Sequence, residues 1–120
     1  MSNIRVEKLN SEFQRNIYEI LSTKVKDPRL TEIFSVTKVS CDKELTYAKV
    51  YVSIFSVDAD KAKSTFEAIK SSVGYVRHSL LKAMRIRSVP ELDFVLDETL
   101  DEGDKIERIL NEIKNGQNGI

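Results

Sequence analysis

The sequence predicts an α+β fold of two layers, in which three strands form one sheet and the helices gather on one of its faces. Apolar residues recur at helical spacing before and after a central pair of β-rich segments, and a third β-rich segment follows the later helices. The expected order is α-β-β-α-α-β-α. With 120 residues and no proline- or glycine-rich interruption before the last few positions, the chain is expected to form a single domain.

The first element is an amphipathic helix from about Ile4 to Thr23. Its apolar residues recur at steps of three and four: Val6, Leu9, Phe13, Ile17, Ile20 and Leu21. The segment KDPRL follows at 26–30, where Pro28 disfavours helical geometry at Asp27. We therefore expect this helix to lie on the core and a connecting loop to follow it.

Two segments at 33–41 and 45–55 are rich in β-branched and aromatic residues and flank a turn-like Asp-Lys-Glu, which predicts an antiparallel hairpin. Alternation in the second strand predicts an inner face of Ala48, Val50, Val52 and Ile54 and an outer face of Tyr47, Lys49, Tyr51, Ser53 and Phe55. The outer face suits base stacking, but tyrosines more often pack across strands, so it defines no site.

Asp58 is a good N-cap for the next helix, which extends to about Ser72. Gly74 then interrupts the pattern, and a glycine inside a helix costs about 1 kcal/mol relative to alanine. We therefore expect a break between two helices here, where the missing side chain permits close approach. The second helix is expected from about Tyr75 to Arg85.

Pro90 ends this helical region because it imposes extended geometry on the residue before it. The segment ELDFVLD at 91–97 alternates apolar and polar residues and predicts a third strand with one apolar face. Thr99 and Glu102 then form a capping-box pattern. A last amphipathic helix follows, with Leu100, Ile106, Ile109, Leu110 and Ile113 on its apolar face, and Asn115 and Gly116 end it.

The charges of this neutral chain are unevenly distributed. Nineteen Lys and Arg residues balance nineteen Asp and Glu residues. Residues 61–90 hold seven of these cations and one carboxylate, a net charge of +6, whereas residues 91–113 hold nine carboxylates and two cations, a net charge of −7. Such asymmetry orients encounters with charged partners, or it makes two solvated parts of one fold attract each other. Charge alone leaves both interpretations open.

The helix after Gly74 places its cations on one face. At 100° per residue, one sector holds Arg77, Arg85, His78 and Lys82, with Tyr75 at its edge and Leu81 within it, and the opposite side holds Val76, Leu80, Ala83 and Met84. Cations in such an array suit phosphates, and the N-terminus of the helix adds backbone N–H groups. The alternative is a basic face that is only solvated surface.

No sequence pattern supports catalysis, a bound metal, a bound cofactor or a membrane span. His78, the only histidine, is accompanied by no Ser, Cys or carboxylate motif, so we do not expect it to be catalytic. Cys41, the only cysteine, is expected to be a small buried apolar residue. Phosphate-loop, dinucleotide and paired metal-ligand patterns are missing, so neither cofactor nor metal is expected. No apolar run is long enough to span a bilayer or to act as a signal peptide, so a cytoplasmic protein is expected.

The amino-acid sequences of four segments, in this order along the chain, resemble those of the ribosome-binding factor A family. They are KDPRL at 26–30, LTYAKVYVS at 45–53, GYVRHSLLKAMRIRSVPELDFVLDETL at 74–100 and EG at 102–103. The resemblance implies a type II KH fold, α-β-β-α-α-β, with an additional C-terminal helix, so that 1–114 form a single KH-like domain and 115–120 a short flexible tail. KH domains typically clamp nucleic acid with a G-x-x-G loop, which is missing here. The family carries an Ala-x-Gly kink between helices, and Ser72-Val73-Gly74 departs from it at Ser72.

The resemblance further implies a function. The chain would be a non-enzymatic assembly factor that binds the free small (30S) ribosomal subunit and its 16S rRNA, promotes late maturation and 5′-end processing, and supports growth in the cold. An assembly GTPase is a further candidate partner, and a monomer is expected. The expected RNA contacts are Arg77, His78, Lys82, Arg85 and Arg87, with Gly74 setting the helix approach and Tyr75 stacking. Lys26 and Arg29 are secondary candidates.

Two other functions stay open from the sequence. One is a protein-interaction module whose acidic C-terminal helix docks a basic, ribosome-associated partner. The other is a small α+β enzyme that uses His78, although no motif defines its activity.

Overall fold

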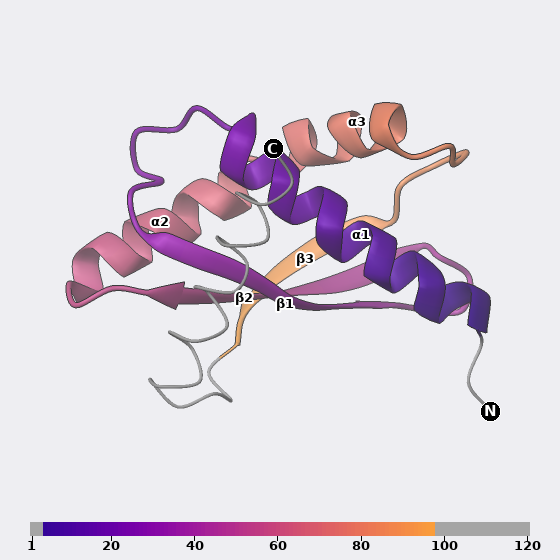
Figure 1. The fold of residues 1–120 in the computed structure, drawn as a ribbon, viewed down its shortest axis with the longest axis horizontal. Helices are drawn as coiled ribbons and strands as arrows, with labels where there is room; N and C mark the ends of the chain where they lie inside the picture. The colour runs from indigo at the N-terminus through magenta and orange to yellow at the C-terminus, as the bar shows by residue number, and fades with distance from the viewer. Residues whose placement is uncertain (1–3, 98–120) are drawn as a thin grey trace, which may run out of the picture.

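The computed structural model describes residues 4–97, in which three helices cover a three-stranded sheet (Figure 1). The elements are α1 (Ile4–Thr23), β1 (Ile33–Cys41), β2 (Tyr47–Phe55), α2 (Ala59–Ser71), α3 (Val73–Ala83) and β3 (Glu91–Leu96). The sheet order is β1-β2-β3, with β1 antiparallel and β3 parallel to β2. The predicted α+β class and type II KH order are confirmed. The predicted C-terminal helix and the tail at 115–120 lie outside the described residues.

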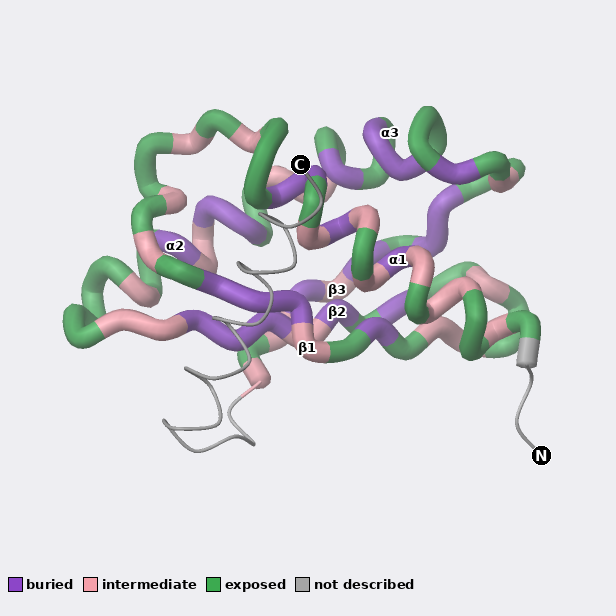
Figure 2. The backbone as a smooth tube through the Cα atoms, viewed as in Figure 1, coloured by how far each residue is buried: buried purple, intermediate pink, exposed green. Residues whose placement is uncertain are grey.

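One apolar core joins the helices to the inner face of the sheet. Its fully buried side chains include Phe13, Ile17 and Leu21 of α1, Val36 of β1, Val50 and Val52 of β2, Ile69 of α2, and Val76 and Leu80 of α3. Buried segments run through the middle of the strands and along the helix sides that face them (Figure 2). The predicted inner face of β2 is therefore confirmed.

The outer face of the sheet is less exposed than alternation predicts. Ser53 was expected on this face, and it lies there opposite Ser35 of β1, but it is only 1% exposed. Leu96, expected on the apolar face of β3, is 45% exposed at the end of its strand. Alternation predicts the face on which a residue lies, but it does not predict how far solvent reaches that face.

A β-bulge at Thr37 shapes β1. Thr37 has no partner in the register with β2, so the backbone there needs other hydrogen-bond partners. Gln14 of α1 donates its side-chain amide to the carbonyl of Val36 at 2.9 Å, and the Thr37 hydroxyl donates to Asp97 at 2.6 Å. Side chains at the bulge thus tie β1 to α1 and to the end of β3.

The turn between β1 and β2 holds Leu45 in the left-handed region, with φ of 59°. Asp42 organises this turn, because its carboxylate accepts hydrogen bonds from the backbone N–H and the hydroxyl of Thr46 at 2.7 and 2.6 Å. These bonds, chiefly the one from the hydroxyl, hold the pKa of Asp42 below its usual range. A left-handed leucine costs about 1–2 kcal/mol because its Cβ crowds the backbone.

The break between α2 and α3 lies at Ser72, within the Ser72-Val73-Gly74 kink that the family resemblance implies and two residues before Gly74, where glycine propensity places it. The backbone N–H of Ser72 donates to the carbonyls of Ala68 and Ile69, and its hydroxyl donates to Ile69 at 2.7 Å. The serine therefore satisfies the end of α2 and lets the chain bend there. Gly74 lies inside α3, and a Cβ on it would meet nothing within 4 Å, so protein packing does not require the glycine.

Asp58 caps α2 as predicted, accepting hydrogen bonds from the backbone N–H groups of Asp60 and Lys61 at 2.9 and 3.1 Å. We expect Asp58→Ala to lower the free energy of unfolding by about 1 kcal/mol because both groups lose their acceptor. Urea unfolding followed by circular dichroism measures this change. Lys63→Ala, on the exposed side of the same helix, is the matched control and should stay within about 0.5 kcal/mol of wild type. Equal values for both variants would contradict the capping role.

Candidate nucleic-acid interface

Tyr75, His78 and Lys82 extend from α3 toward the C-terminal end of α1, which packs beside α3 (Figure 1). Together with Lys24, which follows α1, they line a shallow hollow of about 400 Å³. His78 and both lysines are exposed, and none of them forms a hydrogen bond or ion pair through its side chain within residues 4–97. Among residues 4–97, no carboxylate therefore neutralises the two lysines of this hollow.

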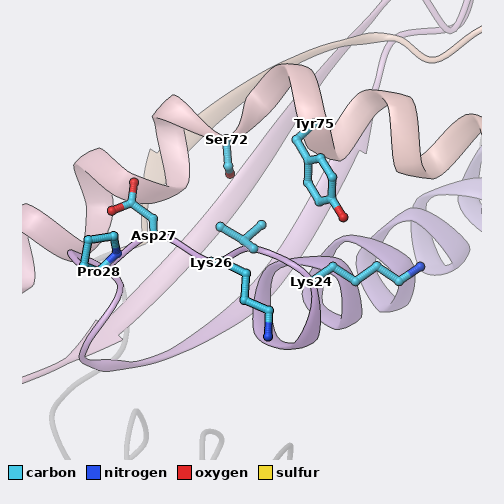
Figure 3. Close-up of a pocket in the computed structure, with 7 residues that line it drawn as sticks. Lys24, Lys26, Asp27, Pro28, Ser72 and Tyr75 are labelled. Carbon is cyan, nitrogen blue, oxygen red and sulfur yellow. The ribbon is translucent and has the colours of Figure 1, made fainter.

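A second hollow, of about 540 Å³, lies where the α1–β1 loop passes the α2–α3 break. Figure 3 shows Tyr75 projecting from α3 toward Lys24, with Lys26 on the loop that follows α1. Tyr75 is 48% exposed, and the apolar residues Val25 and Pro28 line the same hollow. An exposed ring flanked by cations suits an unpaired base and its phosphates. We call the five residues Lys24, Lys26, Tyr75, His78 and Lys82 the junction face.

The structure thus brings the secondary candidate Lys26 beside the primary candidates of α3 and adds Lys24. Sequence reasoning missed Lys24 because no local pattern connects the last turn of α1 with a helix that lies about 50 residues further along the chain. Its only sequence signal is its place two residues before Lys26. The packing of α1 against α3 creates the cluster.

Arg29, the other secondary candidate, is paired within its own loop. Its guanidinium donates to both carboxylate oxygens of Asp27, at 3.1 and 2.8 Å. This pairing lowers the pKa of Asp27 below its ordinary value. Arg29 must give up this bidentate contact before it binds a phosphate in the same way, so it is a weaker candidate than Lys26.

Arg77 is bound to the protein's own backbone. Its guanidinium donates hydrogen bonds to the carbonyl oxygens of Val89, at 2.8 Å, and Pro90, at 3.1 Å. These bonds fix the chain where it enters β3. The helical wheel places Arg77 on the basic face but gives no sign of this contact, which depends on a segment 12 residues away.

Arg85 and Arg87 lie beyond the C-terminal end of α3. The helix was expected to reach Arg85, but α3 ends at Ala83, and Met84 is extended with φ of −114° and ψ of 142°. The wheel angle assigned to Arg85 therefore does not apply. Both arginines line a groove beside the N-terminal half of α1, so the predicted basic face is divided between this groove and the hollow that His78 and Lys82 line.

The apolar side of α3 agrees with its helical wheel except at one position. Val76, Leu80 and Met84 are buried in the core, whereas Ala83 is exposed and lines the hollow beside Lys24. Ala83 is the last residue of α3.

Cys41 is half-buried at the end of β1, not fully buried as expected, although it packs against the core. Partial burial raises the pKa of its thiol to about 11, and Asp42 beside it contributes to this rise. The thiol is therefore protonated at neutral pH, which disfavours it as a nucleophile.

Two features are missing from residues 4–97. Within them, no three His, Cys, Asp or Glu side chains are grouped so that they could hold a metal ion. None of the described helices is sufficiently long and apolar to cross a membrane.

Comparisons with known proteins agree with one another. A family model described as Ribosome-binding factor A matches residues 5–110. Ribosome-binding factor A of Clostridium beijerinckii is 40% identical over 116 residues, which are 97% of this chain and 98% of that protein. The crystal structure of ribosome-binding factor A from Thermus thermophilus matches with a TM-score of 0.67 at 22% identity, covering 79% of this chain and 98% of that chain. A homology model of the Thermus thermophilus factor, fitted into a cryo-electron microscopy map of its 30S complex, matches with a TM-score of 0.60 at 24% identity, covering 73% of this chain and 90% of that chain.

The two hydrogen bonds of Arg77 generate a stability prediction. We expect Arg77→Ala to lower the free energy of unfolding by about 1–2 kcal/mol, because two backbone carbonyls lose a charged donor. Lys82→Ala, on the same helix and without such bonds, should remain within about 0.5 kcal/mol of wild type. Urea unfolding of both variants measures the difference, and an Arg77→Ala variant as stable as Lys82→Ala would argue against the structural role.

The raised pKa of Cys41 generates a reactivity prediction. A rise from 9.0 to about 11 lowers the thiolate fraction about 100-fold at mildly alkaline pH, so alkylation by iodoacetamide should slow by a similar factor relative to an unperturbed thiol. Mass spectrometry of timed samples measures the rate. The same protein in denaturing urea is the control, and equal rates in the folded and unfolded states would show that the fold does not protect the thiol.

Proposed function

Because this chain belongs to the ribosome-binding factor A family, we propose that it is a non-enzymatic assembly factor that binds the free small ribosomal subunit through its 16S rRNA. The observation that carries the RNA contact is the junction face, where three lysines and a histidine surround an exposed tyrosine. Asp27 is the only carboxylate that lines either hollow among the described residues, and it is paired with Arg29. The face therefore favours a polyanion.

The proposed RNA contacts are of two kinds, electrostatic contacts with phosphates and stacking on a base. The lysines neutralise phosphates and release counterions, and Tyr75 stacks on an unpaired base. No side chain caps the N-terminus of α3, because the Ser72 hydroxyl turns back to α2, so this end favours an anion. Gly74, in the first turn of α3, leaves its backbone open to a ligand. Arg85 and Arg87 extend the contact, and Arg77 and Arg29 are the weaker candidates because the fold already engages them.

Binding of this kind would assist rRNA maturation without making or breaking a bond. A ligand shifts a folding equilibrium only by its differential affinity for the two conformations. The factor would bind the mature fold of the 16S rRNA more tightly than misfolded alternatives and so promote late maturation and 5′-end processing. This help would matter most in the cold, when wrong pairings escape slowly. An assembly GTPase is a candidate for the partner that drives release.

Salt-dependent cosedimentation tests the RNA contact. If the three lysines of the junction face, with Arg85 and Arg87, neutralise five phosphates, log affinity should fall against log salt with a slope of about −3 to −4. Lys82→Glu should weaken binding about tenfold and make this slope shallower. The measurement is sedimentation of the protein with free small subunits through sucrose gradients at several salt concentrations.

Lys63→Glu carries the same charge change on the exposed side of α2 and is the matched control. It should bind nearly as wild type does. Affinity that does not change with salt concentration, or an equal loss of affinity in Lys82→Glu and Lys63→Glu, would argue against the junction face. Loss of cosedimentation only when the carboxylates Asp101, Asp104 and Glu112 are neutralised would favour docking through the acidic C-terminal segment instead.

A further inference from the structure

We propose that the groove at the far end of α3 is a second RNA subsite, which holds one unpaired nucleotide with its base on an apolar floor and its phosphates at a cationic rim. The proposal rests on the proposed RNA-binding function and deepens it. In this proposal, Arg85 and Arg87 bind RNA at a subsite separate from the junction face.

Three segments that are distant in sequence form the groove: the N-terminal half of α1, the β1–β2 turn and the connection from α3 to β3. Its volume is about 680 Å³. This lies within the range of roughly 300–1,000 Å³ that is usual for sites that bind small molecules. The groove is therefore large enough for a nucleotide.

The floor of the groove is apolar and firmly held. Phe13 and Met84 are 2% and 6% exposed, and the half-buried Leu9 and Ile86 pack against the same core. A floor of this kind offers a base an apolar surface, and the thioether of methionine makes favourable contacts with aromatic rings. It is less suited to a ligand that carries charge alone.

The rim of the groove is cationic. Four cations line it, Arg5, Lys8, Arg85 and Arg87, against the two carboxylates Glu12 and Glu44. Within residues 4–97, the side chains of Lys8, Arg85 and Arg87 form no salt bridge with either carboxylate. Guanidinium groups both stack on planar rings and bind phosphates through paired hydrogen bonds. The rim thus complements an anion whose other part is flat and apolar, which describes a nucleotide.

Leu45 gives independent support. It lines the groove from the β1–β2 turn, where its backbone is left-handed, a conformation that glycine and asparagine adopt more readily. It is half-buried but is not among the partly buried side chains that pack against the core in the described part of the chain. Unfavourable backbone conformations of this kind cluster at binding sites. Leucine at this position supplies an apolar wall that neither glycine nor asparagine would provide.

An unpaired nucleotide fits these features better than a base pair. In an RNA duplex the base faces are stacked on their neighbours and only the backbone is accessible, whereas loops and single strands expose whole bases. The groove should therefore favour single-stranded RNA, while a face that contacts phosphates alone should bind both forms.

Leu45→Asn separates binding from stability. Asparagine suits the left-handed backbone, so the variant should unfold at the same or a higher urea concentration than wild type, but the groove loses an apolar wall. Fluorescence anisotropy with a short labelled single-stranded RNA of mixed sequence should show affinity lowered on the order of fivefold. The Lys8→Glu, Arg87→Glu double variant should lose about tenfold or more. Leu45→Asn should leave binding to a duplex of the same sequence unchanged.

Lys63→Glu is the control for charge, and Lys82→Glu reports on the junction face separately. If both groove variants bind the single strand as wild type does while Lys82→Glu is weakened, the groove proposal is overturned and the proposed function stands. If wild type binds neither RNA nor small subunits, the proposed function fails, and the groove proposal fails with it. If the groove variants lose small-subunit binding but retain RNA affinity, the groove contacts an acidic protein surface, and the nucleotide proposal is overturned.

Discussion

The parallel pairing of β3 with β2 is the constraint on which the rest of the structure depends. Two parallel neighbours cannot be joined by a tight turn, so the chain must return along the sheet through a long crossover, here α2 and α3. The bend at Ser72 lets this crossover bring α3 beside α1. The Arg77 guanidinium then binds the backbone that enters β3 and so holds α3 to that strand. The junction face extends from Tyr75 to Lys82 along α3, and the groove lies past the C-terminal end of this helix. Both surfaces exist because the crossover places α3 beside α1 and near the β1–β2 turn.

A neutral chain can carry basic surfaces because many of its carboxylates are engaged locally. Asp27, Glu32 and Asp42 accept hydrogen bonds from residues close to them in space, chiefly Arg29, Ser56 and Thr46, and these bonds lower the pKa of each carboxyl. Their contribution to stability is therefore present above the ordinary pKa of a carboxyl group and is lost as pH falls through the lower values of the folded state. The lysines of the junction face have no such partners within the described residues. In this fold, neighbouring residues thus bind these carboxylates, whereas the lysines of the junction face are exposed.

Sequence reasoning succeeded where local periodicity decides the outcome. The bounds of α1 and β1, the hairpin and the N-cap at Asp58 were predicted from spacing and capping chemistry, and all were confirmed. It failed where a single local hydrogen bond or a distant segment overrides the pattern. Glycine propensity favoured a break at Gly74, but the hydroxyl of Ser72 closes α2 earlier. The helical wheel assumed a regular helix up to Arg85, although α3 ends at Ala83 and Met84 is extended. Neither the cations contributed by α1 nor the backbone contacts of Arg77 have a local signal, because tertiary packing creates them.

The bulge at Thr37 also affects how copies of this protein meet. β1 lies at the edge of the described sheet, so one row of its backbone N–H and C=O groups faces away from β2. A regular row of this kind is a template on which another chain can add a strand, the first step of many aggregation reactions. The bulge breaks the spacing of the row, and the exposed Lys38 beside it places a charge there. The bulge that ties β1 to α1 and to the end of β3 therefore also discourages two molecules from joining edge to edge.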